Sequence, residues 1–269
     1  MRKVIFALLA LVATTATACQ KSDTEPAKKK ATVVLVHGAW QGPYAWVPVV
    51  SKLQQQGYTV VNVELLAHGK DQTAAAGLTM NRYRDQVLAV VNAQPAAQVV
   101  LVGHSLGGAI ISTVAEAAPT KIAKLVYVAG FLPANQQSVF ELAGQDTQSL
   151  LGPALSTSPD GALAAVNRAQ LVNIFCQDGM VAVQQQVLDN YRDEPAGPPA
   201  EKVTLSAANY GRVPKYYVRT LQDHALSPVL QDLMLRATPV QQEYRLNSGH
   251  TPQLTNPEEL SRIIAEIAE

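Results

Sequence analysis

The chain is poor in cysteine and has no excess of either charge. Its 269 residues include two cysteines, and 21 basic residues balance 21 acidic ones. Without a net charge, the molecule as a whole would not attract nucleic acid or an anionic membrane through a long-range field. The composition therefore favours a small neutral ligand over a nucleic acid as the partner.

The first apolar run, residues 4–12, is too short to span a bilayer as a helix of a mature protein. Arg2 and Lys3 precede this run and small residues follow it, which predicts an export signal over residues 1–18. Cleavage at that point would leave Cys19 first, as in the bacterial lipoprotein signal, which this segment resembles. We therefore predict an exported protein that is membrane-anchored through a lipidated Cys19, or otherwise periplasmic or secreted.

Residues 19–30 are rich in Lys, Asp and Glu and have no periodic apolar positions, so we expect a solvated, flexible tether. The folded domain is predicted to begin near Ala31. With Cys19 used as an anchor, Cys176 has no partner for an internal disulfide. Its apolar neighbours indicate a buried structural thiol.

Strand and helix signals alternate along much of the domain. Apolar, β-branched runs typical of buried parallel strands lie at residues 32–36, 59–63, 98–102, 124–129, 215–219 and 240–246. Helices are predicted at residues 48–56, 81–92, 106–118 and from Pro257 onward, with Asn256 as its N-cap. This alternation is typical of right-handed βαβ units, so we predict an α/β fold with a doubly wound parallel sheet.

Between residues 132 and 213 the alternation stops. The stretch is rich in Ala, Gln and Leu, is broken by Pro and Gly, and shows little strand signal. We interpret residues 132–213 as a helical cap inserted into a core formed by residues 31–131 and 214–269. The chain length fits one domain with an insertion better than two domains.

The run Gly103-His104-Ser105-Leu106-Gly107 stands between a predicted buried strand and a predicted helix. That is the context required of a G-x-S-x-G nucleophile elbow. Glycines two positions either side of the serine let strand and helix approach, and the sharp turn exposes the Ser105 hydroxyl. The N–H of Leu106, at the positive end of the helix, would point toward a negative oxygen forming there. A merely structural turn is the alternative.

A serine hydroxyl becomes a good nucleophile when a base takes its proton and an acid orients that base. His250 is the expected base, because it lies in a loop just after the last predicted strand. Asp223 is the expected acid, since it follows a strand predicted to end near Thr220. Asp232, its main competitor, falls within a helix-like stretch and should face solvent. The order serine, acid, histidine is that of the α/β-hydrolase arrangement.

The remaining four histidines have other expected roles. His104 adjoins the serine and is expected to pack, while His37 and His68 lie in glycine-containing turns and are expected to hold loops by hydrogen bonds. His224 is expected in an exposed loop. No pair shows metal-ligand spacing with nearby Cys or carboxylates, so we expect no metal site, and no cofactor is implied.

The loop after the first predicted strand, residues 37–40, is expected to complete an oxyanion hole. Gly38 would let the backbone approach closely, and the N–H of Ala39 would join that of Leu106. Candidate pocket-lining residues are Trp40, Tyr44, Trp46, Phe131 and Tyr210. Ordinary core packing is the alternative for at least half of these aromatic side chains.

Four segments resemble one branch of the α/β-hydrolases. They are VLVHGAW at residues 34–40, GHSLGG at 103–108, the stretch 211–228 and SGHTPQLTNP at 248–257. The branch contains plant methyl esterases, hydroxynitrile lyases and bacterial carboxylesterases such as pyrethroid hydrolases. The resemblance implies an α/β-hydrolase fold, with a mostly parallel six-stranded sheet flanked by helices beneath an inserted helical cap. It also implies an acid at Asp223, a base at His250 and oxyanion donors at Ala39 and Leu106.

Lyases of this branch carry Thr after the first-loop His and Lys after the catalytic His, whereas this chain has Gly38 and Thr251. The resemblance therefore favours a serine esterase that hydrolyses small to medium apolar carboxylic esters through an acyl-enzyme intermediate. Hydroxynitrile-lyase-type C–C cleavage and a non-catalytic ligand-binding protein on the same scaffold are the alternatives. Residues 64–69 depart from the Asp and Pro of many relatives, and we expect that loop only to shape the sheet edge.

Overall fold

The computed structural model describes residues 30–95 and 99–269. The predicted export signal, Cys19 and all but the last residue of the predicted tether lie outside the described residues. Within the described part of the chain, no helix has both the length and the apolar character needed to cross a bilayer.

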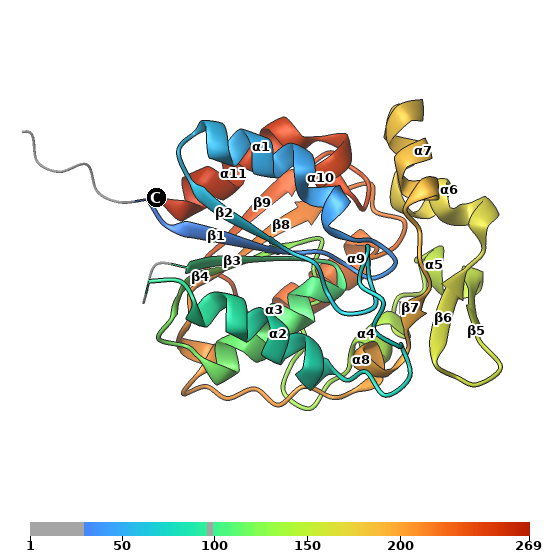
Figure 1. Cartoon of the computed structure of the whole chain (residues 1–269), viewed down its shortest axis with the longest axis horizontal. Coiled ribbons are helices and arrows are strands. Elements are labelled where there is room, and N and C mark those ends of the chain that lie inside the picture. Colours follow the sequence, from blue (N-terminus) through green and yellow to red (C-terminus); the bar gives the residue numbers. More distant parts are fainter. Residues whose placement is uncertain (1–29, 96–98) are drawn as a thin grey trace, which may run out of the picture.

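A six-stranded sheet runs through the middle of the molecule, in the order β2-β1-β3-β4-β8-β9 (Figure 1). Its strands are β1 (Thr32–Val36), β2 (Thr59–Val63), β3 (Val99–His104), β4 (Ile122–Val128), β8 (Lys215–Thr220) and β9 (Gln242–Leu246). Every pairing within it is parallel. The predicted fold class, a largely parallel sheet of six strands flanked by helices, is confirmed.

Helices cover both faces of this sheet (Figure 1). They include α1 (Val47–Gln55), α2 (Met80–Asn92), α3 (Leu106–Ala117), α9 (Pro228–Ala237), α10 (Pro252–Thr255) and α11 (Pro257–Ala268). The side chains of Val33 and Leu35 join the core under α1 and α11, while Val34 and Val36 join the core under α2 and α3. This two-sided burial explains why β1 reads as a continuous apolar run rather than an alternating one.

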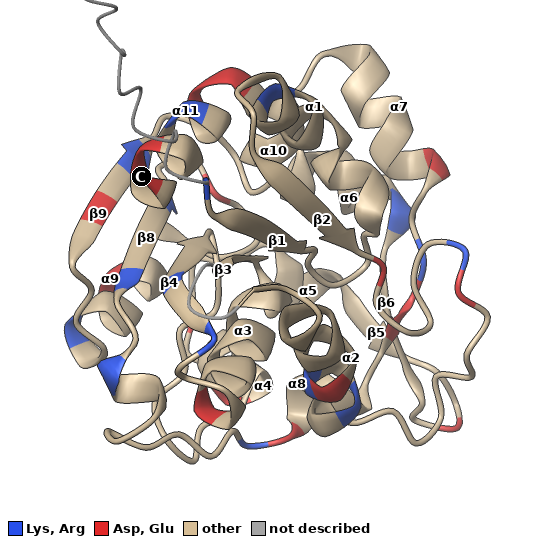
Figure 2. Cartoon of the chain, turned by 60° about the vertical axis from the view of Figure 1, so that its left-hand side comes forward, with Lys and Arg blue, Asp and Glu red and all other residues tan. Residues whose placement is uncertain are grey.

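Asn256 occupies the N-cap position of α11, as predicted, but its side chain makes no capping hydrogen bond. Pro257 stands at the first position of this helix, where a missing N–H costs nothing. In the view of Figure 2, acidic and basic residues are interspersed along the ribbon rather than gathered by sign, which agrees with the balanced charge of the chain.

Residues 132–213, hereafter the inserted segment, contain strands as well as helices. The helices are α4 (Val139–Ala143), α5 (Leu151–Ala154), α6 (Leu171–Phe175), α7 (Val181–Asp189) and α8 (Gly197–Ala200). The strands are β5 (Leu155–Thr157), β6 (Leu163–Val166) and β7 (Glu194–Pro195), which form a small antiparallel sheet. The segment expected to be helical, with little strand signal, thus also contains a small sheet. Strands of two to four residues carry too little periodicity to be recognised in a sequence.

Candidate active site

Ser105 occupies a sharp turn between β3 and α3. Its φ is 50°, in the left-handed region that a residue with a side chain adopts only under strain. A Cβ atom at Gly107 would lie 2.7 Å from the carbonyl oxygen of Val36, and one at Gly103 would overlap the backbone of Gly107. Glycine is therefore required at both positions for strand, turn and helix to pack this closely.

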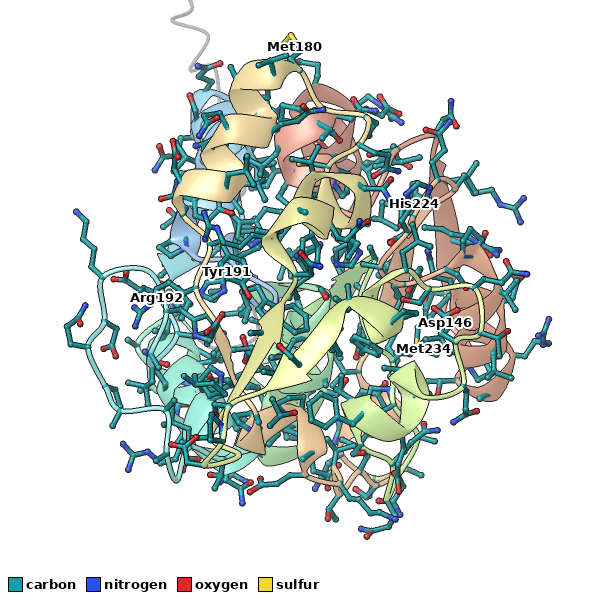
Figure 3. All side chains as sticks on the ribbon, turned by 90° about the vertical axis from the view of Figure 1, so that its right-hand side faces the viewer. Asp146, Met180, Tyr191, Arg192, His224 and Met234 are labelled. Carbon is teal, nitrogen blue, oxygen red and sulfur yellow. The ribbon has the colours of Figure 1, made fainter. Side chains whose placement is uncertain are left out.

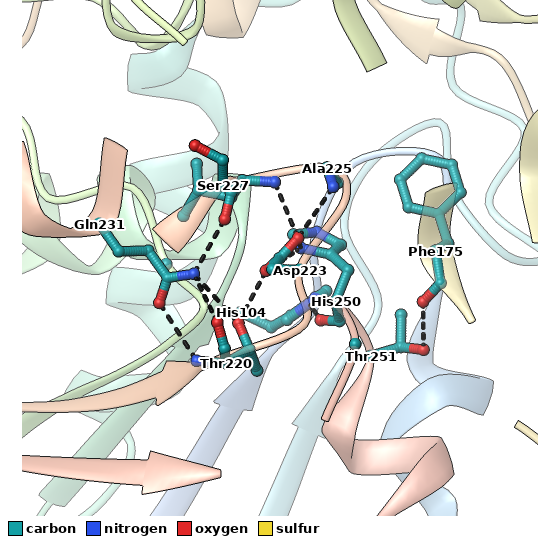
Figure 4. A network of polar contacts seen from close by, with 12 residues as sticks. His104, Phe175, Thr220, Asp223, Ala225, Ser227, Gln231, His250 and Thr251 are labelled. Atoms are coloured by element: carbon teal, nitrogen blue, oxygen red, sulfur yellow. Dashed lines mark hydrogen bonds and ion pairs between the residues drawn. The ribbon is translucent and has the colours of Figure 1, made fainter. Parts of the chain in front are cut away.

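His250 and Asp223 form a buried pair at the carboxyl edge of the sheet (Figure 4). The ring nitrogen Nδ1 of His250 lies 3.0 Å from Oδ1 and 2.9 Å from Oδ2 of Asp223. The Asp223 carboxylate also accepts hydrogen bonds from the Thr220 hydroxyl and from the N–H groups of Ala225 and Leu226. These contacts fix the carboxylate and, through it, the orientation of the imidazole ring.

The second ring nitrogen of His250, Nε2, forms no hydrogen bond with any residue that the structure describes. The ring lies beside the residue preceding the serine: the centroids of the His250 and His104 rings are 4.7 Å apart, and Nε2 of His104 donates to the His250 carbonyl at 2.8 Å. No hydrogen bond within 3.5 Å joins Ser105 and His250 across the described residues. Contacts of this kind commonly tighten only when substrate binds.

Ser105 opens into a small cavity of about 40 Å³. Two of the predicted binding residues, Trp40 and Phe131, line this cavity, as do the predicted oxyanion donors Ala39 and Leu106. The rest of the wall comes from the inserted segment and consists of Val139, Phe140, Ala143, Leu151, Leu155, Glu194 and Pro199. Apart from Ser105 and Glu194, the lining side chains are apolar or aromatic.

Three other aromatic candidates lie elsewhere. Tyr44 lines a separate surface groove together with Tyr191 and Arg192, both labelled in Figure 3. Tyr210 packs under the sheet, where its hydroxyl accepts a hydrogen bond from Tyr127. Trp46 is fully buried beneath α1. The expectation that Tyr44 and Tyr210 line the pocket is corrected: Tyr44 lines a different groove, and Tyr210 packs in the core against Tyr127.

The loop at residues 37–40 approaches the serine as closely as the backbone allows. A Cβ atom at Gly38 would lie 2.7 Å from Cβ of Ser105 and 2.8 Å from Nδ1 of His104. Among the described residues, the N–H groups of Ala39 and Leu106 donate to no acceptor. Two free N–H groups beside a nucleophile are suited to bind a developing oxyanion.

The histidines of the first two loops do hold those loops by hydrogen bonds. Nε2 of His37 accepts from the N–H of Leu65, and its Nδ1 lies 2.9 Å from the Gly38 carbonyl. Its ring is therefore neutral, in keeping with a pKa that burial and the nearby charge of His68 lower to about 3. His68 has a further contact that the sequence did not indicate: its Nε2 lies 2.7 Å from Oε2 of Glu194.

Glu194 is the residue of this cavity that sequence reasoning missed. It is fully buried in β7, 126 positions from His68, and no local motif surrounds it. The loop at residues 64–69, expected only to shape the sheet edge, places His68 against this carboxylate. Glu194 follows Arg192 and Asp193 in a polar segment, so the sequence gives no signal that its carboxylate is buried or which cavity it lines.

Three further residues complete the comparison with the sequence predictions. Asp232 lies on α9 with a partly exposed side chain, paired with Arg219. His224 is half-buried rather than exposed, because its Nδ1 contacts the carbonyl of Asn173 in the inserted segment. Cys176 is buried as a free thiol, and burial raises its pKa to about 12.

Residues 33–263 match the model of a family described as the alpha/beta hydrolase family. The chain belongs to the alpha/beta hydrolase family. The resemblance of its motifs to the branch of methyl esterases and related hydrolases is confirmed by curated relatives. Putative methylesterases 13 and 11 of Arabidopsis thaliana, both named chloroplastic, are each 30% identical over 88% and 87% of this chain. The chain spans 56% and 63% of their lengths.

Solved structures share the fold of this alpha/beta hydrolase at lower identity. Tomato methylketone synthase I has a TM-score of 0.80 at 22% identity, covering 89% of this chain and 98% of its own. A pyrethroid hydrolase from Sphingobium faniae JZ-2 has a TM-score of 0.77 at 24% identity, covering 88% and 97%. Polyneuridine aldehyde esterase reaches 0.81 at 20% identity, covering 89% and 100%. None of these comparisons supports lipidation at Cys19, which stays a sequence prediction.

Proposed function

We propose that the protein is a serine hydrolase of carboxylic esters, with Ser105 as nucleophile, His250 as general base and Asp223 as the acid that orients it. The observation that carries the proposal is the buried contact between Nδ1 of His250 and Asp223, at 2.9 Å, beside a serine strained into an elbow. Because Asp223 occupies Nδ1, the proton from the serine would go to Nε2.

The reaction proceeds in two halves. Ser105 Oγ attacks the ester carbonyl while His250 Nε2 takes its proton, and the oxygen becomes an anion held by the N–H groups of Ala39 and Leu106. The bond to the leaving alcohol then breaks and His250 returns the proton to that alcohol. Water, deprotonated by the same nitrogen, attacks the acyl-enzyme; the bond from the acyl carbon to Ser105 Oγ breaks, His250 returns the proton to Oγ, and the carboxylic acid leaves. Asp223 stays charged throughout.

The preferred substrates are esters with small to medium, mainly apolar acyl groups. The cavity beside Ser105 has apolar walls, including Phe131 and Val139, and a volume of about 40 Å³, so a longer chain would need the inserted segment to move. The names of the methylesterase relatives support an ester as the substrate class. We extend the proposal to residues 132–213 acting as a cap on a core of residues 31–131 and 214–269.

Cyanohydrin cleavage is the weaker candidate. The position after His250 holds Thr251, whose hydroxyl is engaged in donating to the Phe175 carbonyl at 2.7 Å. Neither that residue nor Gly38 offers a cation for departing cyanide. A parallel assay of mandelonitrile cleavage separates the two reactions.

The direct test is Ser105→Ala. This variant should keep the circular dichroism spectrum of the wild type, lose hydrolysis of p-nitrophenyl acetate, and fail to react with a fluorophosphonate probe. Ser112→Ala is the matched control, because Ser112 is also a buried serine but lies within α3 and bonds to Tyr127 rather than lining the cavity. Retained turnover in Ser105→Ala would refute the assignment. Mass spectrometry of the mature N-terminus tests lipidation at Cys19.

A further inference from the structure

Glu194 is one of the residues that line the cavity beside Ser105. Its side chain is fully buried, and Oε2 accepts hydrogen bonds from the Trp40 N–H at 3.1 Å and from Nε2 of His68 at 2.7 Å. The other oxygen, Oε1, is buried without a hydrogen-bond partner among the described residues. Buried polar atoms are almost always satisfied, so an unpaired carboxylate oxygen on a residue that lines a cavity indicates a site for a donor.

His68 neutralises this carboxylate. Both of its ring nitrogens face acceptors, Nδ1 the Leu66 carbonyl at 2.9 Å and Nε2 the Glu194 carboxylate. Only an imidazolium can donate at both positions. Burial by itself would lower the pKa of His68, but the charge and hydrogen bond of Glu194, together with the hydrogen bond to Leu66, raise it above the ordinary value. The pair is neutral as a whole, so it can lie next to the oxyanion donors without repelling an oxyanion by a net charge.

The position of the cavity identifies which part of an ester would enter it. The leaving alcohol must lie beside His250 to receive its proton, whereas the cavity is lined by the loop of Ala39 and by the inserted segment, not by His250. The cavity therefore takes the acyl group. Apart from Ser105, Glu194 supplies the only side-chain acceptor among the described residues of its wall.

We propose that Oε1 of Glu194 determines acyl specificity by accepting a hydrogen bond from a hydroxyl group, so that short hydroxyacyl esters are the preferred substrates. A neutral hydroxyl fits better than an ammonium group, because a cation would lose its hydration in an apolar cavity and meet the imidazolium of His68. This inference rests on the proposed esterase function and deepens it.

The test compares methyl 3-hydroxybutanoate, methyl butanoate and methyl 3-oxobutanoate. The wild type should show a higher kcat/KM for the hydroxy ester than for either other ester, by about tenfold or more, as for a hydrogen bond to a charged acceptor. In Glu194→Gln the amide oxygen should face the donors Trp40 and His68, which leaves the NH2 group toward the cavity. The NH2 group can donate to a ketone, so the hydroxy-to-oxo ratio should fall about tenfold.

The ratio of two esters within one variant cancels the effect of partial unfolding, and comparing that ratio between variants cancels the intrinsic reactivity of each ester. Glu201→Gln is the matched control: Glu201 belongs to the same inserted segment and accepts from the Met80 N–H, but it does not line the cavity, so the wild-type ratio should persist. Esters hydrolysed without preference by the wild type, or an unaltered ratio in Glu194→Gln, would overturn this inference alone. Failure to hydrolyse any of the three esters would instead count against the proposed function.

Discussion

Two buried histidine–carboxylate pairs lie near Ser105. They differ in whether the second ring nitrogen of the histidine forms a hydrogen bond. His250 contacts Asp223 at 2.9 Å and His68 contacts Glu194 at 2.7 Å, with all four side chains almost fully buried. In the first pair Nε2 of the ring is free among the described residues, whereas both nitrogens of His68 are bonded. A histidine next to a carboxylate can act as a base only when its other nitrogen remains available.

The carboxylates differ in the opposite way, because the free hydrogen-bonding atom belongs to the second pair rather than the first. Asp223 accepts hydrogen bonds from Thr220, Ala225, Leu226 and His250, so both of its oxygens are occupied. Glu194 has one occupied and one unpaired oxygen. In the proposed function the free group of the first pair is the base, and in the further proposal the free group of the second pair is the acceptor. A buried histidine–carboxylate pair would thus serve proton transfer in one place and recognition in the other.

The largest expected effect separates the two histidines. His250→Gln should lower kcat for p-nitrophenyl acetate by about 10⁴-fold or more, because no group would take the serine proton. His68→Gln keeps a hydrogen-bond donor for Glu194, so its kcat should fall far less. Steady-state kinetics on both variants provides the measurement. Comparable losses would show that the second nitrogen does not distinguish the two pairs.

Asp223→Asn should have the next largest effect, a reduction of kcat by about 10⁴-fold. The amide of the variant would donate to Nδ1 of His250 and stabilise the tautomer whose Nε2 carries a proton, which cannot act as a base. Single-turnover measurement of acylation isolates this step. A loss below about tenfold would mean that the Asp223 contact does not set the tautomer.

The loop at residues 37–40 lies against Ser105 at Gly38 and against Glu194 at Trp40. Gly38→Ala tests how closely this loop must approach the serine. The added Cβ would lie 2.7 Å from Cβ of Ser105, which should displace the oxyanion donors and reduce kcat by about a hundredfold. Gly152→Ala is the control, since a Cβ there meets nothing within 4 Å. Equal kcat values for these two glycine variants would contradict the tight approach of the loop.

The smallest expected effect is on the pH dependence of the free energy of unfolding. Here the charged His68 should differ from the neutral His37 and His104. Burial first, and then nearby histidines, lower the pKa of His37 to about 3 and that of His104 well below its ordinary value. The unfolded chain then binds more protons than the folded one below pH 6.5, so stability is lost as pH falls. From pH 6.5 to 5 the loss should be about 1 to 2 kcal/mol for each of the two.

His68 should oppose this trend weakly. Its raised pKa gives a contribution to stability that is complete below pH 6.5 and is lost as pH rises through the folded-state value. Urea unfolding at pH 6.5 and 5 measures the summed contribution of the three histidines to the free energy of unfolding. Carboxyl groups mostly remain ionised in this pH range. Between pH 6.5 and 5, the free energy of unfolding of His104→Gln should drop less than that of the wild type. An identical drop in both would contradict a neutral, buried His104.

The core could be predicted closely because its signals are local. The strands at Thr32–Val36 and Thr59–Val63 have the predicted bounds, and the predicted helices at 48–56 and 81–92 begin within a residue of α1 and α2. The inserted segment could not be predicted in this way. Its strand β7 comprises two residues and pairs with β6 about thirty positions earlier, so its structure depends on a distant partner.

The sequence by itself determined the chemistry available at the elbow: a serine flanked by the glycines that its turn requires, with an acid and a histidine following later strands. Only the tertiary structure decided that Glu194 meets His68 beside that serine and that Tyr44 and Tyr210 do not line the cavity. The physical reason is that strand and turn signals arise between neighbouring residues. The environment of a buried carboxylate arises instead when segments 126 positions apart pack together and exclude water.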